Sequence, residues 1–286
     1  MAIDYDKLMN FRVSDVEQEL TVRDTMLYAL GVGLGHDPMN EDELQFVYEK
    51  DLQALPTMAV VLGYMNDMLG KVDAGIDRTR TVNGGNSFTI HRSLPVEGTL
   101  TSEIRITEVI DKGPGRGAIV QGERKVYDKA GGDHLCTIGT STFCRGQGGF
   151  GGPDGPSTAA RNIPDRKPDQ ICDLPTLPQS ALIYRLSGDY NPLHAEPAHA
   201  KRAGFDRPIA HGLLTYGVAG HALLKSCCGY DPARFRSMEG RFSSPVFPGD
   251  TIRTEMWRDD DSVIFRSSVP DRDAVVITNG HAEIAA

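Results

Sequence analysis

The sequence has no long hydrophobic run. Its 286 residues contain no uninterrupted apolar stretch of about 18 residues, the length that a membrane-spanning helix needs. The first residues are acidic and lack the apolar core of a secretory signal, and the last residues carry no S-K-L peroxisomal address. We therefore expect a cytoplasmic protein without membrane contact.

Cysteine is scarce and scattered. The five cysteines are odd in number, and none has the C-x-x-C spacing of a zinc site, so neither a disulfide framework nor a structural metal is expected. They are Cys136, Cys144, Cys172, Cys227 and Cys228. The adjacent pair at 227–228 ends an apolar segment, which predicts core packing.

Positive charge is also in deficit. Lys and Arg number 30 against 39 Asp and Glu, which gives a net charge of −9. Nucleic-acid binding needs a basic footprint, so this composition argues against it. A local cluster of Arg and Lys can still bind an anionic small ligand. The hydrophobic content of 40% is enough for one large domain or two modest ones.

Glycine and proline gather in one segment, 145–157, which reads R-G-Q-G-G-F-G-G-P-D-G-P-S. Neither a helix nor a ladder strand can form there, so the segment predicts a surface linker. We expect an N-terminal unit over 1–145, a linker over 146–168 and a C-terminal unit over 169–286.

The two units resemble each other. Residues 28–33 resemble 184–189, and residues 91–99 resemble 241–251, at a separation of about 150 residues in both cases. The identity is weak, so coincidence is the alternative. Two landmarks at one separation favour duplication.

Each unit combines helix-like segments with later alternating, β-branched segments. The predicted helices are 21–31, about 56–69, about 178–186 and about 212–226. Thr21, with Asp24 three residues on, predicts a capped start for the first of them. The predicted strands are 99–109, 117–127, 134–144, 251–257, 262–269 and 273–285. One apolar helix followed by several long strands, twice, predicts an α+β fold with a helix wrapped by an antiparallel sheet.

One loop carries an acid and an imidazole close together. Gly188 ends the preceding helix and Pro192 prevents its continuation, so Asp189, Asn191 and His194 lie on a tight irregular loop. Such a loop can direct a carboxylate and an imidazole toward one water for general acid–base catalysis. On composition alone, an Asx-type turn beside a surface histidine explains the same residues.

A glycine at a predicted helix start is the second candidate. Gly212 follows His211 and opens an apolar helix, so its backbone N–H points out of the positive end of the helix dipole. That N–H suits a thioester oxygen that gains charge as an enolate forms. The alternative is a glycine that only allows close packing.

The segment from residue 184 resembles the signature of the MaoC-like, type 2 enoyl-CoA hydratases. The pattern is aromatic, aliphatic, small, G-D-x-N-P-[LIV]-H and a later small residue. It is matched by Tyr184, Leu186, Ser187, Gly188, Asp189, Asn191, Pro192, Leu193, His194 and Ala200. The likeness continues at 203–205, 208–213 and 241–251, and the whole chain resembles the two-repeat members of the family, such as the hydratase part of the peroxisomal multifunctional enzyme.

The resemblance implies a double hot-dog fold in which only the second repeat keeps the catalytic loop. Members add water syn to trans-2-enoyl-CoA and form the (3R)-3-hydroxyacyl-CoA. By that likeness, Asp189 and His194 form the catalytic pair, Asn191 supports it, and the Gly212 N–H polarises the thioester carbonyl. The first repeat is expected to open a tunnel for the acyl chain. The positions opposite the catalytic ones lie near Gly33, Gly35 and Pro38, beside an adjacent His36 and Asp37.

Residues that flank the matched motifs are the candidates for substrate binding. They are Tyr190, His211, Phe205, Lys201, Arg202 and Arg241. The three cations are candidates for the CoA phosphates, with solvated surface charge as the alternative. His211 is also a candidate for a structural role. We expect an acyl-CoA substrate, no metal or redox cofactor, and a homodimer.

Three functions are compatible with the sequence. Hydration is favoured, a thioesterase or dehydratase acting on another acyl thioester is the second, and a non-catalytic acyl-CoA-binding subunit is the third. The pair of Asp189 and His194 argues against the third, because binding alone does not need it. The sequence leaves open the acyl group, the direction in the cell and which residue of the pair is the acid.

Overall fold

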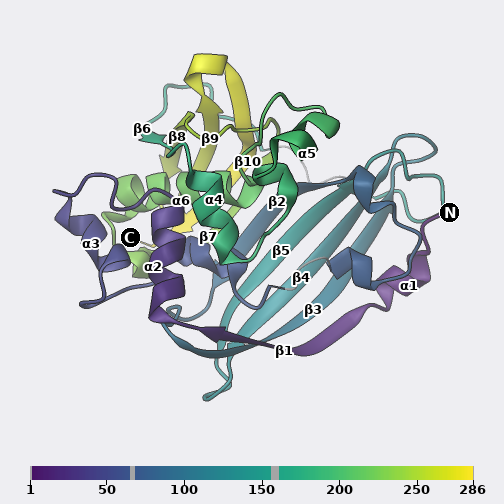
Figure 1. Cartoon of the computed structure of the whole chain (residues 1–286), viewed down its shortest axis with the longest axis horizontal. Helices are drawn as coiled ribbons and strands as arrows, with labels where there is room; N and C mark the ends of the chain where they lie inside the picture. The colour runs from purple at the N-terminus through teal and green to yellow at the C-terminus, as the bar shows by residue number, and fades with distance from the viewer. Residues whose placement is uncertain (1, 65–67, 156–160, 286) are drawn as a thin grey trace.

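Ten strands form one continuous antiparallel sheet in the computed structural model, which describes residues 2–64, 68–155 and 161–285 (Figure 1). The strands are β1 (Arg12–Leu20), β2 (Thr81–Ile90), β3 (Gly98–Asp111), β4 (Ala118–Asp128), β5 (His134–Cys144), β6 (Gln170–Pro175), β7 (Phe235–Phe242), β8 (Thr251–Asp259), β9 (Ser262–Val269) and β10 (Ala274–Ile284). All six predicted strands are present, so the predicted α+β class is confirmed.

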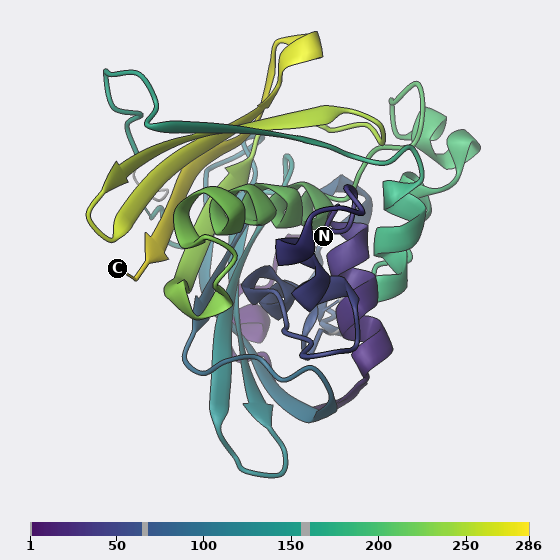
Figure 2. The same ribbon diagram turned by 90° about the vertical axis from the view of Figure 1, so that its left-hand side faces the viewer.

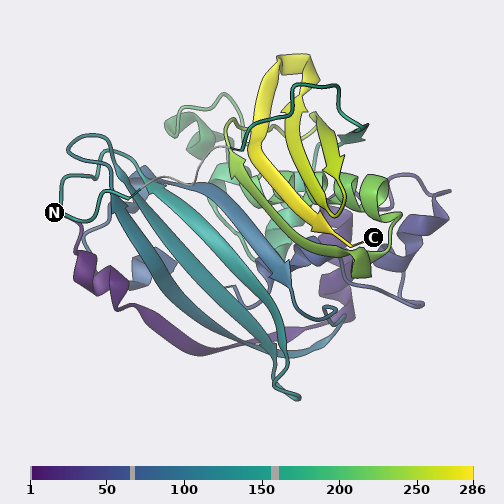
Figure 3. The ribbon, with the colours of Figure 1, turned by 180° about the vertical axis from the view of Figure 1, so that it is seen from behind.

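The order of the strands records the duplication. The sheet runs β1-β3-β4-β5-β2 through the first half and β7-β10-β9-β8-β6 through the second, so each half contributes five strands in mirrored order. Seen from behind in Figure 3, the blue strand β2 of the first half lies beside the green strand β7 of the second, with which it pairs. A Cβ atom on Gly85 would lie 2.7 Å from the Gly240 carbonyl oxygen. Glycine is therefore needed where β2 pairs with β7, which we call the joint between the two halves. This order supports duplication rather than coincidence.

Four strands were not predicted, for two physical reasons. β1 and β6 lie at the two edges of the sheet, where charged and polar residues replace the apolar alternation. β2 and β7 lie at the centre but carry Gly84, Gly85 and Gly240 where the joint is crowded. Neither pair therefore carries the sequence pattern of a typical strand.

The helices pack mainly on one side of the second-half sheet. They are α1 (Tyr5–Met9), α2 (Val22–Gly31), α3 (Glu41–Val47), α4 (Ser180–Tyr184), α5 (Pro197–Arg202) and α6 (Gly212–Cys228), with 3-10 turns η1 (Pro56–Val61), η2 (Met68–Lys71), η3 (Arg78–Arg80), η4 (Arg185–Ser187), η5 (Pro192–His194), η6 (Pro232–Arg234) and η7 (Pro270–Arg272). The capping box at Thr21 is confirmed. Figure 2 shows α6 between the second-half sheet and the first-half helices. No helix of the described residues is long and apolar enough to cross a membrane.

The predicted helix over 56–69 is wrong in its described part. The described residues of this segment form the short turn η1 and the first two residues of η2, and residues 65–67 of the prediction lie outside the described residues. Gly63 has φ +57°, and a Cβ there would lie 2.6 Å from the Ser102 Cβ atom, so the chain turns against β3 instead of continuing a helix. Ser102 also donates from its hydroxyl to the Gly63 carbonyl. The long helix expected in each repeat is therefore present only as α6.

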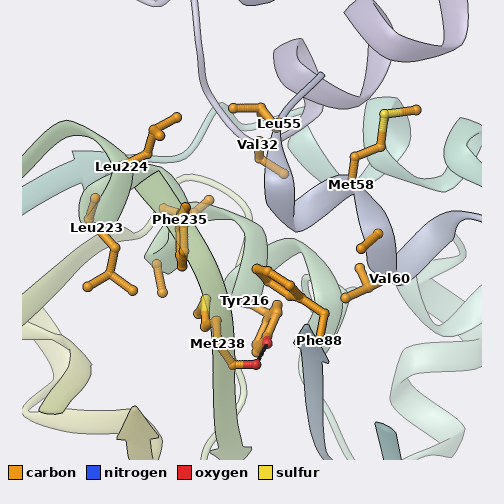
Figure 4. Close-up of a cluster of buried hydrophobic side chains, with 14 of the residues drawn as sticks. Val32, Leu55, Met58, Val60, Phe88, Tyr216, Leu223, Leu224, Phe235 and Met238 are labelled. Atoms are coloured by element: carbon orange, nitrogen blue, oxygen red, sulfur yellow. Dashed lines mark hydrogen bonds between the residues drawn. The ribbon is translucent and has the colours of Figure 1, made fainter. Parts of the chain in front are cut away.

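The main core lies between α6, η1 and the central strands. Figure 4 shows Phe88 and Tyr216 among aliphatic side chains from both halves. The Tyr216 hydroxyl donates to the Met238 carbonyl over 2.6 Å. Cys227 and Cys228 are buried in this core, which confirms their predicted packing role.

The described residues of the predicted linker are exposed or half-buried for the most part. Between β5 and β6, the described residues include no helix or strand. Backbone N–H groups of Gly149 and Gly151 donate to the Asp111 carboxylate, which fixes the start of the linker at the end of β3. Beyond the residues that are not described, Arg161 pairs with Glu239 of β7.

A buried acid joins the two halves. Glu43 on α3 accepts from the Tyr230 hydroxyl (2.8 Å), the His221 ring of α6 (3.3 Å) and the Gly35 N–H (2.7 Å). Burial alone would raise the pKa of Glu43, but these hydrogen bonds outweigh it and lower the pKa from 4.5 to about 2. The charged acid therefore links α3 of the first half to α6 of the second.

We predict that Glu43→Gln lowers the free energy of unfolding by about 3 kcal/mol, because the new amide nitrogen must face one of the donors in either orientation. The wild-type contribution is complete above the unfolded pKa of 4.5 and disappears as the pH falls toward 2. Urea unfolding across this pH range measures both effects. Glu41→Gln, on the exposed side of the same helix, is the matched control. An equal change in both variants would contradict the prediction.

Candidate active site

A tight loop presents the predicted acid and imidazole. It begins at Gly188, whose φ of +122° ends the helical run of α4 and η4. The Asn191 N–H donates to Asp189 Oδ1 over 3.1 Å, and Asn191 Oδ1 accepts from the Leu193 N–H over 3.0 Å. Asn191 therefore fixes the carboxylate through its backbone and begins η5, which carries His194, through its side chain. The Asx turn and the candidate catalytic loop are the same structure.

His194 is oriented with one ring nitrogen free. Its Nδ1 lies 2.9 Å from the Ile209 carbonyl oxygen, which can only accept, so Nδ1 carries the proton and Nε2 holds a lone pair. Burial lowers the pKa of His194, more than the Ile209 contact and the Asp189 charge raise it. The imidazole is therefore a neutral base at neutral pH.

His211 forms the second ring of the site. It stacks on His194 with ring centroids 3.8 Å apart, and its Nε2 donates to the Asp189 carbonyl over 3.1 Å. Burial, and then the neighbouring His194, lower its pKa to about 4. Polar atoms of Asp189, His194 and His211 lie within 4.8 Å of one another. A gap of this size admits one water between the carboxylate and an imidazole.

These three residues are also a possible ligand set for a metal ion. The two rings are only 30° from parallel, so their lone pairs do not converge on one point. His211 Nε2 and His194 Nδ1 are already engaged with backbone carbonyls. The arrangement suits a water held between acid and base better than a coordinated cation.

Gly212 is the first residue of α6, as predicted. Its N–H has no acceptor within the helix, and the N-cap His211 makes no side-chain cap. A Cβ on Gly212 would lie 3.2 Å from the Phe242 ring, so close packing also favours glycine. The position at the helix start and the close packing are both present, and the role of the N–H as an oxyanion donor stays a prediction.

A cavity of about 620 Å³ opens beside the loop. The second half contributes Asp189 and Tyr190 among other residues, while His194 and Gly212 are not lining residues themselves. Most of the wall belongs to the first half, from the inner face of β2 to β5 and from the segment around η1. Described residues of the segment that was predicted as a helix, such as Val60 and Met68, line the cavity. Its size is typical of a small-molecule site.

The predicted binding residues separate in the structure. Tyr190 lines the cavity, and the Arg185 guanidinium lies 4.9 Å above its ring. Lys201, Arg202 and Phe205 lie on α5 or just after it, outside the lining, and the two cations are exposed. Their role with CoA stays a prediction.

Arg241 lies on the other side of the sheet. Its neighbour Gly240 approaches the core ring of Tyr216, so Arg241 points to the opposite face and lines a separate hollow of about 420 Å³. The structure therefore does not bring Arg241 to the catalytic loop, and its role with the CoA phosphates stays a prediction.

In the corresponding first-half loop, the residues make local hydrogen bonds and do not form an acid–base pair. Gly33 and Gly35 both take positive φ, and the Gly35 N–H binds Glu43. His36 is exposed, and Asp37 Oδ1 accepts from the Met39 N–H.

Sequence reasoning missed two cations in the cavity wall, Arg78 and Arg124, of which only Arg124 is buried. Residues 118, 120, 122 and 126 of β4 are buried on the inner face, so the alternation alone places residue 124 inward. The side chain is 5% exposed. The two-residue alternation of buried positions along β4 is the sequence signal that could have predicted this inward cation.

Both halves of the chain are similar to known protein families. Family models for the MFE-2 hydratase 2 N-terminal domain and the MaoC-like domain match residues 18–146 and 159–279. A peroxisomal enoyl-CoA hydratase 2 of Arabidopsis thaliana is 37% identical over 98% of this chain and 94% of its own length. The crystal structure of a MaoC-like dehydratase from Phytophthora capsici has a TM-score of 0.87 at 33% identity, covering 99% of this chain and 98% of that chain.

A more distant structure supports the fold alone. A Mycobacterium tuberculosis protein described as a double hotdog fold has a TM-score of 0.62 at 15% identity, covering 99% of this chain and 97% of that chain. The predicted double hot-dog fold is thereby confirmed.

We predict that His194 is neutral and protonated at Nδ1 at pH 7, and that it titrates below its ordinary 6.5 because it is buried. His211 should titrate near pH 4. A pH series of imidazole 15N spectra measures both, and His194→Gln identifies the resonance. A His194 that is protonated at Nε2 or charged at pH 7 would refute the assigned proton pattern.

Proposed function

This chain belongs to the two-repeat MaoC-like enoyl-CoA hydratase 2 family, and we propose that it is an R-specific 2-enoyl-CoA hydratase. As a hydro-lyase it would add water to trans-2-enoyl-CoA and form (3R)-3-hydroxyacyl-CoA, or remove that water in reverse. The observation that carries the proposal is the convergence of Asp189 and the unprotonated Nε2 side of His194 beside a cavity of substrate size.

The proton pattern supports a specific sequence of steps. A water held by the Asp189 carboxylate gives a proton to His194 Nε2, and its hydroxide oxygen bonds to C3 of the enoyl group. The electron pair of the double bond moves onto the thioester oxygen, where the Gly212 N–H stabilises the enolate. The imidazolium of His194 then returns the proton to C2. One water supplies both added groups from one side, which accounts for syn addition.

The proposal requires no metal or redox cofactor, because water activation uses two side chains and carbonyl polarisation uses a backbone N–H. We also propose a cytoplasmic homodimer, since closed two-fold pairing is the commonest assembly of such enzymes. The Arabidopsis relative is named peroxisomal. Light scattering of the purified chain tests the dimer, and cell fractionation tests the location.

We predict that the purified protein hydrates trans-2-enoyl-CoA to the (3R) alcohol, and that Asp189→Asn and His194→Gln each lower kcat by about 10²–10⁴-fold, because each removes one partner of the water. Loss of the conjugated-enoyl absorbance and chiral analysis of the product measure this. Prior dialysis against a chelator should change nothing. Release of free CoA without hydration would instead indicate a thioesterase, and no turnover would indicate a binding subunit.

We predict that Gly212→Pro lowers kcat by about 10²–10³-fold, because proline removes the proposed oxyanion donor. Proline fits the first position of a helix, and His211 already has φ −61° and ψ 142°, a conformation that suits a residue before proline. Gly212→Ala is the matched control, since it keeps the N–H and also contacts Phe242. Equal losses in both variants would mean that packing, and not the N–H, explains the glycine.

A further inference from the structure

Arg124 is a buried cation without an acidic partner in the described part of the chain. Its side chain is 5% exposed, and its Nη2 donates to the Val60 carbonyl over 2.7 Å. The buried Nε makes no hydrogen bond to any of the described residues. The guanidinium lies 5.4 Å from the centre of the Tyr64 ring, which offers a π face but no counter-charge.

Such a group is costly unless something binds it. An arginine has five N–H donors and stays protonated even here, where burial lowers its pKa from 12.5 to about 10. A buried charge without a counter-ion destabilises a fold, and proteins normally pair it. A packing role alone does not explain a cation at an inward position of β4, since its inward neighbours are Ala118, Val120, Gly122 and Val126.

Arg124 faces the same cavity as the catalytic loop. Arg124 and Asp189 both line it, although they come from different halves of the chain. The wall of the cavity mixes apolar side chains, among them Val60, Met68 and Ile104, with polar ones. The polar side chains include Asn83, Asn86 and Thr140. An acyl chain that is apolar along its length but carries oxygen at its end matches such a mixed lining.

The position of Arg124 favours the acyl end of the substrate over its CoA end. The nucleotide of CoA is bulky and carries several phosphates, so it needs a groove with solvent-exposed cations. Arg124 is a single buried cation on the inner face of the first-half sheet, in the wall of the cavity. An acyl chain that extends from the reacting carbons at Asp189 enters this cavity.

We propose that the cavity selects 2-enoyl-CoA thioesters whose acyl chain ends in a carboxylate, and that Arg124 binds that carboxylate. The proposal rests on the proposed hydratase function and adds its substrate class. A planar carboxylate matches the fork of the guanidinium and uses the donors that the fold leaves open. Arg124 acts here as a specificity residue and takes no part in the proton transfers.

The test compares trans-2-enoyl-CoA substrates that end in a carboxylate with methyl-terminated ones of equal length, over a series of lengths. At the best length, the carboxylate should raise kcat/KM by about tenfold or more, as expected for a charge-assisted hydrogen bond. Arg124→Met should abolish this ratio by lowering only the carboxylated rate. Arg124→Lys should keep part of it. Lys125→Met, on the same strand but the opposite face, should leave it unchanged.

The outcomes separate this proposal from the proposed function. If methyl-terminated substrates are hydrated but the wild type shows no preference at any length, or if Arg124→Met keeps the preference, the carboxylate site is refuted and the hydratase stands. If neither substrate is hydrated, the hydratase itself fails. A purely structural role for Arg124 would lower both rates together. If Arg124→Met does not fold, the wild-type ratio and Arg124→Lys decide.

Discussion

The close contact between α6 and the first half is the constraint on which the rest of the structure depends. A Cβ on Gly220 would lie 2.1 Å from the Thr57 side chain, and one on Gly217 would lie 2.5 Å from Val32. The two glycines let η1 and the end of α2 reach the helix itself, so one long helix serves the core of both repeats. The start of the same helix fixes Gly212 behind the catalytic loop.

The two repeats have diverged into different tasks on one scaffold. In the second, the loop after α4 carries Asp189 and His194, while the equivalent first-half loop binds Glu43 and stabilises the joint. In the first, the segment after η1 turns away at Gly63 and leaves the cavity open. We infer that one repeat supplies the chemistry and the other shapes the substrate space. The duplication allows this because each half keeps its five strands.

The site is organised by neutral groups and backbone atoms around one half-buried acid, Asp189. Burial keeps His194 and His211 uncharged, and carbonyls of Ile209 and Asp189 fix the proton on each ring. Because the partners are backbone atoms of the fold, the proton pattern exists before substrate arrives. Preorganisation of this kind reduces the rearrangement that the reaction needs.

The sequence by itself determined the class of the fold, six strands, the helix at Gly212 and the loop from Gly188 to His194, because alternation, turn residues and the matched motif act locally. Only the tertiary structure showed the strands β1, β2, β6 and β7 and the loss of the predicted helix in the described part of 56–69. It also decided where Arg241 and Arg124 lie. The polar edge strands and glycine-rich central strands are stabilised by their neighbours, which no local pattern records. Likewise, the turn at Gly63 depends on β3, and the cavity depends on both halves, so only the folded chain brings Arg124 and Asp189 to one space.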